Sequence, residues 1–142
     1  MKHHSSNYLK IWGIMAPSFQ SDDPYEGLID PACRIQVVRK LFENGLHEKD
    51  LARSLKLSTG QLARCLLGTD LPHHAQERLP RLLRILSLAY GLFEGDLTAA
   101  ARWVALPAKA LGGEPPMTMT RDHDEVEEVC HVVGRLEWGV LL

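Results

Sequence analysis

The sequence contains few of the residues that build disulfide frameworks, and it has no long apolar run. Cysteine occurs three times in 142 residues, and Cys33, Cys65 and Cys130 are too widely spaced for a Cys-x-x-Cys zinc site. No apolar stretch approaches the ~20 residues that a bilayer-spanning helix needs. The N-terminus lacks the basic start, apolar stretch and small-residue cleavage site of a signal peptide. We therefore expect a protein of the reducing cytoplasm, with neither a disulfide framework nor a structural metal.

The sequence also lacks a recognisable catalytic constellation. No Ser-His-Asp, Cys-His or paired-carboxylate arrangement can be proposed from the spacing. Gly112-Gly113 is no phosphate-binding loop, because no strand precedes it and no Lys-Ser or Lys-Thr follows. His123, Glu127 and His131 have a spacing that could hold a metal, but an acidic helix surface produces such triples readily. We expect no enzymatic activity, no cofactor and no bound metal.

Charge is unevenly distributed along the chain, whose net charge is −2. Residues 1–33 carry a net charge of −2, residues 34–84 carry +5 and residues 85–142 carry −5. A basic middle followed by an acidic end predicts two surfaces with different partners, one of which is a polyanion. A random scatter of surface charge is the alternative explanation of the same totals.

The apolar spacing predicts an all-α fold. The length allows one domain or two small ones that share a core, and the hydrophobic (45%) and charged (24%) fractions are typical of globular proteins. From residue 33 onward apolar residues recur at three- and four-residue intervals, with Gly45 and Gly68 placed to end helices. No segment alternates as a strand does. Residues 1–32 show no sustained period and carry three prolines in PSFQSDDPYEGLIDP, so we expect a flexible or extended N-terminal arm.

The most apolar predicted helix lies in residues 79–93. It is hydrophobic around most of its circumference, which predicts burial on more than one side. Because the chain is small, we expect one of these sides to face a second copy. The residues expected at this dimer interface are Leu82, Leu83, Leu86 and Tyr90.

Residues 48–68, EKDLARSLKLSTGQLARCLLG, have the spacing of a helix-turn-helix. Ala52 lies where the two helices must cross closely, Leu57 fills the apolar position of the turn, and Ser58 can cap the second helix. Lys56 replaces the glycine usual in this turn. A helix pair of this spacing also occurs as plain core packing.

The second helix of this motif is expected to enter the major groove of DNA. Gln can bond adenine and Arg can bond guanine, while basic side chains bind phosphates. Arg39, Lys40 and Arg53 are further candidates for phosphate contact. The residues expected at the DNA interface are Lys49, Lys56, Ser58, Thr59, Gly60, Gln61 and Arg64.

Three segments of the chain closely resemble the Xre/MbcA/ParS family of antitoxins. They read LARCLLGTDLPHHAQERLPRLLRILSLAYGLF, AARWVALPAKALGGEPP and VGRLEWGVLL. The family pattern is an Arg-Trp pair, a Pro-x-x-Ala-Leu-Gly-Gly-x-x-Pro turn, and a last helix ending in Gly and apolar residues. Two departures occur: Ala108 stands where Asn is frequent, and Met117-Thr118-Met119-Thr120 replaces a Leu-rich segment. The resemblance covers residues from about 34 to 142.

The resemblance implies an Xre-like helix-turn-helix with a dimerising helix in residues 33–93 and a toxin-binding domain in residues 94–142. It implies that the protein neutralises a RES-domain toxin, which consumes NAD or transfers parts of it, and represses its own promoter. The implied partners are a cognate RES-domain toxin, operator DNA and a second copy of the chain. The residues implied for toxin binding are Arg102, Trp103, Leu111, Gly112, Gly113, Arg135, Trp138, Gly139, Val140, Leu141 and Leu142.

The apolar C-terminal segment LEWGVLL has two interpretations. By the resemblance it reaches into or over the NAD site of the toxin as a plug. Burial of Val140 and the two leucines would contribute on the order of 1.5–3 kcal/mol each, and Trp is a typical interface anchor. Alternatively, the segment folds back onto its own core and covers the last helix.

Two other functions remain open at this point. One is a stand-alone helix-turn-helix regulator whose C-terminal domain senses something other than a toxin. The other is a toxin-binding module that has lost DNA binding, for which Lys56 in the turn is the only indication.

Overall fold

The computed structural model describes residues 2–17, 28–68 and 70–139, with side chains from residue 7 onward, and these residues form helices and connecting turns without any strand. This confirms the all-α prediction. None of the helices in the described ranges is long and apolar enough to cross a membrane. The α-helices are α1 (Lys2–Met15), α3 (Pro31–Glu43), α4 (Glu48–Ser54), α5 (Thr59–Leu66), α6 (His73–Leu92), α7 (Leu97–Val104) and α8 (His123–Glu137), and two 3₁₀ helices are η1 (Lys109–Leu111) and η2 (Pro116–Thr118).

Short polar side chains begin four of these helices. Asp30, Ser58, Asp96 and Asp122 each accept a hydrogen bond from a backbone N–H in the first turn of α3, α5, α7 and α8 respectively. Such caps satisfy amide groups that have no partner within the helix, and each contributes about 1 kcal/mol. The starts of these four helices are therefore determined by residues within their own first turns.

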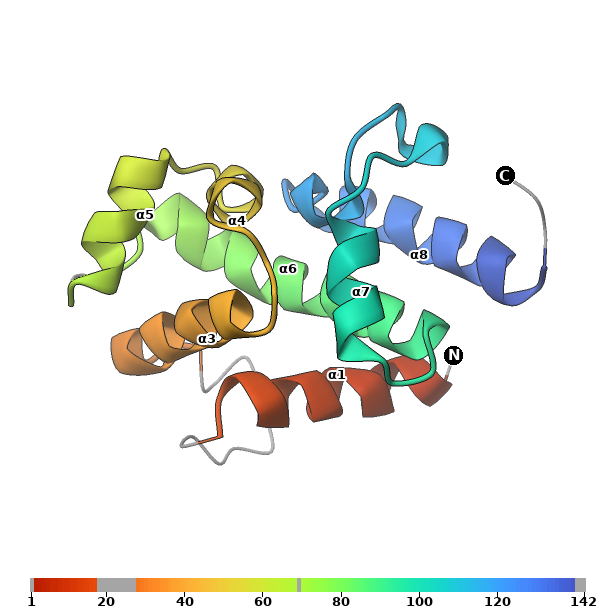
Figure 1. Cartoon of the computed structure of the whole chain (residues 1–142), viewed down its shortest axis with the longest axis horizontal. Coiled ribbons are helices and arrows are strands. Elements are labelled where there is room, and N and C mark those ends of the chain that lie inside the picture. The colour runs from red at the N-terminus through yellow and green to blue at the C-terminus, as the bar shows by residue number, and fades with distance from the viewer. Residues whose placement is uncertain (1, 18–27, 69, 140–142) are drawn as a thin grey trace.

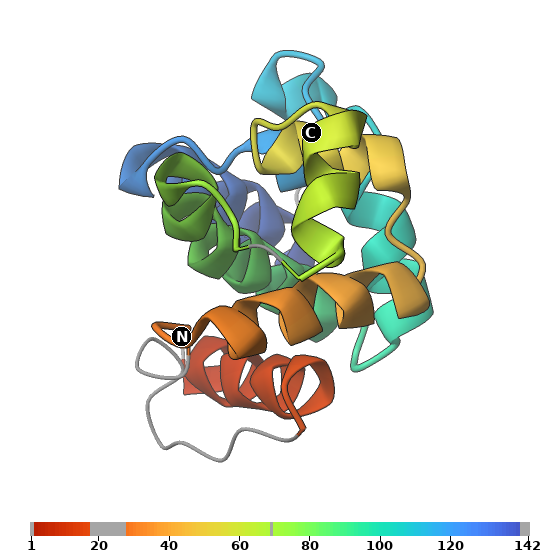
Figure 2. The same ribbon diagram turned by 90° about the vertical axis from the view of Figure 1, so that its left-hand side faces the viewer.

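The long helix α6 organises the fold by packing against α1, α7 and α8. In Figure 1 it crosses the middle of the molecule, with α1 along one side and α8 near the other. Figure 2 shows α1, α3 and α5 one above the other, in agreement with the α1–α3 and α3–α5 contacts. This arrangement places the helix-turn-helix at one end of α6 and the C-terminal helices at the other.

The expectation of a flexible or extended arm in residues 1–32 is wrong for Lys2–Met15, which form α1. Ile11 and Met15 are fully buried and Trp12 is 4% exposed, because this face of α1 packs on α6. Tyr8, Ile11, Trp12 and Met15 have the three- and four-residue spacing of an amphipathic helix. The proline-containing stretch after α1 falls mostly in residues 18–27, outside the described residues.

The structure also contradicts the predicted dimer interface on α6. Leu82, Leu83 and Leu86 are at most 1% exposed within one chain, so they cannot reach a second copy in this fold, and Tyr90 is half-buried. The second apolar side of α6 is covered by α1 from the same chain. The two helices approach so closely that a Cβ at Gly91 would lie 2.4 Å from Asn7 Nδ2.

Hydrogen bonds that Thr120 donates and accepts join the two halves of the chain. Its hydroxyl donates to the carbonyl of Ser54 at the end of α4 and accepts from Arg78 Nη1 on α6 at 3.2 Å. Arg81 Nη1 donates to the carbonyls of Thr120 and Arg121 at 3.1 and 2.9 Å. The hydrophobic core is continuous across the predicted domain boundary at residues 93 and 94.

Candidate nucleic-acid and partner interfaces

The α4–turn–α5 segment has the packing of a helix-turn-helix. Ala52 is 2% exposed at the helix crossing, and its carbonyl accepts from the Leu57 N–H at 2.8 Å. Leu57 is 8% exposed, and Leu62 and Cys65 on α5 face the core as the spacing predicts. The helix-turn-helix therefore has both its close crossing and its buried turn residue.

Lys56 occupies the turn in the left-handed conformation, with φ of 59°. An ordinary residue pays about 1–2 kcal/mol for this conformation, which explains why glycine is usual there. The Lys56 carbonyl lies 3.0 Å from His74 Nε2 at the start of α6, and its side chain is exposed. Lys56 thus adopts the backbone conformation that is usual for glycine at this position. Its backbone is strained, and its charged side chain is exposed.

The structure places the predicted DNA-contact residues on one exposed part of the molecule. Lys49 lies on α4, Lys56 in the turn and Ser58 at the cap of α5. The outer side of α5 carries the others. Those exposed on α5 are Thr59, Gly60, Gln61 and Arg64.

Gln61 has a structural role that the sequence analysis missed. Its Oε1 accepts from the Ser58 N–H at 2.9 Å, while its own N–H donates to Ser58 Oγ at 3.1 Å. This reciprocal pair is a capping box, and the Ser-x-x-Gln spacing is its sequence signature. Bidentate reading of adenine needs both the oxygen and the nitrogen of the amide, so Gln61 would have to release Ser58 first.

The Gly-Gly turn of the C-terminal half is closed by backbone hydrogen bonds. The Gly113 N–H donates to the Ala108 carbonyl at 3.0 Å, and the Ala108 N–H donates to the Glu114 carbonyl at 3.1 Å. Gly112 and Gly113 have φ of 69° and 86°, as expected for a tight turn. Because no atom lies within 4 Å of a Cβ built on either glycine, backbone conformation rather than crowding requires glycine here.

The other residues predicted for toxin binding differ in exposure. Leu111 is 6% exposed and anchors the turn to the core. Trp103 is half-buried, with its ring centroid 6.3 Å from that of Phe93, whereas Arg102 and Arg135 are exposed. Leu106, 56% exposed and next to Pro107, is an apolar surface residue that the sequence analysis did not single out.

The end of α8 tests the fold-back interpretation of the C-terminal segment for Trp138 alone. Trp138 caps α8 and is 87% exposed, and Gly139 follows with φ of 72°. The interpretation in which Trp138 packs on its own core is therefore wrong. Val140, Leu141 and Leu142 lie outside the described residues.

The three cysteines are held in their thiol form by burial. Burial raises the pKa of Cys33 to about 11 and raises the pKa values of Cys65 and Cys130 above their ordinary range. A thiolate is the nucleophilic form, so these environments oppose nucleophilic chemistry.

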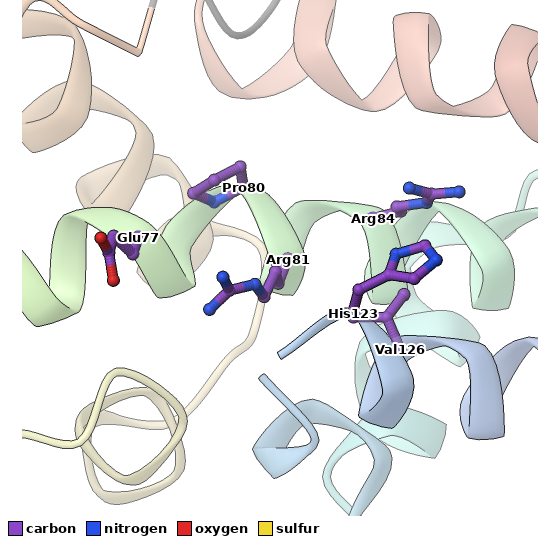
Figure 3. A pocket seen from close by; sticks show the side chains of 6 residues that line it. All are labelled: Glu77, Pro80, Arg81, Arg84, His123 and Val126. Carbon is purple, nitrogen blue, oxygen red and sulfur yellow. The ribbon is translucent and has the colours of Figure 1, made fainter. Parts of the chain in front are cut away.

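A pocket of about 250 Å³ lies between α6 and α8, and none of the residues predicted for DNA or toxin binding lines it. Figure 3 shows its lining, in which Arg81 and Arg84 come from α6 and His123 from the start of α8. His123 lies 3.5 Å from Glu127, and no group of three potential ligands is placed to hold a metal among the described residues. The pocket is lined by charges of both signs, since Glu77 also contributes.

Comparison with known proteins identifies the C-terminal part of this all-α, helix-turn-helix-containing chain. Residues 88–139 match the antitoxin Xre/MbcA/ParS C-terminal toxin-binding domain. What this match shows is the similarity of residues 88–139 to that domain.

Parts of two curated proteins are also similar to parts of this chain. The chain is 39% identical over 64 residues to an antitoxin Xre of Yersinia enterocolitica, a match that covers 45% of this chain and 43% of the relative. It is 32% identical over 65 residues to an antitoxin Xre of Photorhabdus laumondii, covering 46% of this chain and 44% of the relative. The chain thus spans less than half the length of each of these relatives.

Proposed function

We propose that this protein is the antitoxin of a toxin–antitoxin pair and that it acts by binding, not by catalysis. The observation that carries this proposal is the 87% exposure of Trp138 at the end of the domain that matches the toxin-binding family. A tryptophan left in water by its own fold is well suited to anchor a partner. The exposed Gly112-Gly113 turn and Leu106 add to the same domain's accessible surface.

The proposed partner is a RES-domain toxin that uses NAD. The C-terminal segment from Trp138 onward would enter or cover the NAD site of the toxin. The toxin would then be inhibited because NAD cannot enter its site. Expression of the product of the adjacent reading frame, with and without this protein, tests the pairing through growth, cellular NAD and co-purification. Toxicity with a fall in NAD, rescued by a stable complex, is expected.

The decisive comparison uses two exposed apolar residues. Trp138→Ala should weaken the complex and the rescue, whereas Leu67→Ala, at a residue 86% exposed at the end of α5, should leave the toxin complex intact. Both variants should fold with unchanged melting temperatures. A complex of undiminished affinity with Trp138→Ala would contradict the role of the tail.

We further propose that the helix-turn-helix binds operator DNA and represses the promoter of the pair. The exposed side chains of Lys49, Lys56 and Arg64 support this, since cations near a recognition helix supply salt-dependent affinity. Homodimerisation stays part of the proposal, but through a surface other than Leu82, Leu83 and Leu86.

The variant that best tests DNA reading is Arg64→Ala, because Gln61→Ala would also remove the cap of α5. Ala63→Ser, at an exposed neighbouring position of α5, is the matched control. Loss of operator affinity only in Arg64→Ala is expected. Equal affinity of both variants and the parent protein would favour a toxin-binding module that does not read DNA through this helix.

The remaining candidate is a stand-alone regulator. It would bind DNA through the same helix-turn-helix, yet the neighbouring gene product would be harmless and would not co-purify with it. The match to a toxin-binding domain favours the antitoxin.

A further inference from the structure

One ion pair connects the two surfaces proposed above. Arg53 Nη2 on α4 donates to Glu114 Oε2 at 2.9 Å, across 61 residues of sequence. Arg53 belongs to the first helix of the helix-turn-helix. Glu114 directly follows the Gly112-Gly113 turn of the toxin-binding domain.

The surroundings hold Glu114 in this position. Its Oε2 lies 3.2 Å from the Thr118 hydroxyl, which also donates to the Pro115 carbonyl at 2.8 Å. The backbone N–H and carbonyl of Glu114 both take part in closing the turn. The 3₁₀ helix η2, which begins two residues later, packs against α4. The backbone of Glu114 is therefore fixed by the turn, and the turn holds the carboxylate next to α4.

Arg53 lies among the cations expected to bind DNA phosphates. It is one helical turn after Lys49 on α4 and three residues before Lys56, and all three residues are exposed. The side chains of Arg53 and Glu114 are 56% and 51% exposed, so the pair is at the surface, where a phosphate could approach. Such a pair contributes little to stability, because water and salt screen it.

We propose that Glu114 sets the DNA affinity of the protein by occupying Arg53 in place of a DNA phosphate. This inference rests on the DNA-binding part of the proposed function. While Arg53 is paired with Glu114 it does not neutralise a DNA phosphate. The counterions condensed on that phosphate are then not released, so Arg53 adds less to the affinity and to its salt dependence. The same carboxylate repels the approaching phosphate backbone. DNA binding is thereby restrained by the domain that binds the toxin.

The test measures binding of the 142-residue protein to a short random-sequence duplex over a series of salt concentrations. Glu114→Gln keeps the size of the side chain and removes its charge. Glu128→Gln, at an exposed position of α8, makes the same change in net charge away from α4 and is the matched control. Melting temperatures establish that both variants fold.

Glu114→Gln should bind about two- to fivefold more tightly at low salt, with a log–log salt slope steeper by up to about 0.9, the value of one freed phosphate contact. Glu128→Gln should change affinity much less and should leave the slope unaltered. The effect of Glu114→Gln should disappear when Arg53→Gln is also present, because the restraint acts through Arg53.

Equal effects of Glu114→Gln and Glu128→Gln, with DNA bound by the unaltered protein, would overturn the inference and leave the proposed function standing. An effect that persists in the Arg53→Gln background would overturn it as well, since simple repulsion would explain the result. If neither the unaltered protein nor Glu114→Gln binds duplex DNA, the DNA-binding part of the proposed function fails and the inference fails with it.

Discussion

The two tryptophans near the ends of the described chain have opposite environments. Trp12 on α1 is 4% exposed and packs into the core against α6, whereas Trp138 at the end of α8 is 87% exposed. Trp12 continues the apolar spacing of α1, four residues after Tyr8, whereas the residues three and four before Trp138 are Arg135 and Gly134. The same side chain thus completes the fold at one end and stays in water at the other.

The largest expected effect is on the buried member of this pair. Trp12→Ala should lower the free energy of unfolding by about 3–5 kcal/mol, because it removes a large side chain from the interface of α1 and α6. Thermal denaturation should show a melting temperature lower by about 10 °C or more. Size-exclusion chromatography should also show association, since loosening of α1 exposes the apolar face of α6. An unchanged melting temperature would mean that α1 adds little to the fold.

The exposed member should behave in the opposite way. Trp138→Ala should leave the melting temperature of the free protein within about 1–2 °C of the unaltered protein, because the side chain buries little surface. Its affinity for the toxin should fall by about 2 kcal/mol, or roughly 30-fold. Calorimetry on the purified partners measures the affinity. A loss of stability without a loss of affinity would reverse the assignment of the two tryptophans.

Polar contacts between Arg34 and Asp70 also hold the N-terminal half together. Arg34, 7% exposed, donates from Nε to Asp70 Oδ1 at 3.0 Å and from Nη1 to the carbonyls of Leu28 and Ile29 at 2.6 and 2.8 Å. Asp70→Asn should lower the free energy of unfolding by about 1–2 kcal/mol, because a largely buried guanidinium loses its charged acceptor. Asp124→Asn, at an exposed position of α8, is the control with the same charge change.

The effect of Asp70→Asn should depend on pH. Hydrogen bonds from Arg34 hold the pKa of Asp70 below its ordinary value, so its stabilising contribution is fully present above about pH 4. It is lost as the pH falls through the lowered pKa, where the carboxylate becomes protonated in the folded protein. Denaturant titrations at neutral and acidic pH should therefore show the difference between the two proteins shrinking as acidity increases. A constant difference would argue against the ion pair.

The smallest expected effect concerns Lys56, which lies in the turn of the helix-turn-helix and is a proposed DNA contact. Lys56→Gly should raise the free energy of unfolding by up to about 1 kcal/mol, because glycine adopts the left-handed conformation without strain. Lys56→Ala loses the same charge but keeps the strain, so it should not be stabilised. Both should bind DNA more weakly if Lys56 contacts a phosphate. Equal melting temperatures for the two variants would contradict the strained turn.

Much of the local structure is predictable from the sequence. The spacing of apolar residues predicts the helices after residue 33 and the burial of Ala52, Leu57 and Leu62 in the helix-turn-helix. The Ser58-x-x-Gln61 spacing is the signature of a capping box, but Gln61 was predicted only as a base contact. Helix α1 was not predicted, because its short apolar stripe from Tyr8 to Met15 follows a polar run and precedes a stretch with three prolines.

After residue 30 the capped helix starts, the glycines of the tight turns and the apolar helix faces can be read from the sequence, because these depend on backbone geometry and on neighbours a few residues apart. The sequence could not decide what covers each apolar face. Only the tertiary structure shows that α1 covers α6, that Trp138 remains outside, and that Glu114 reaches Arg53. The physical reason is that burial and ion pairing depend on segments far apart in the chain, and hydrophobicity carries no information about which partner removes a side chain from water.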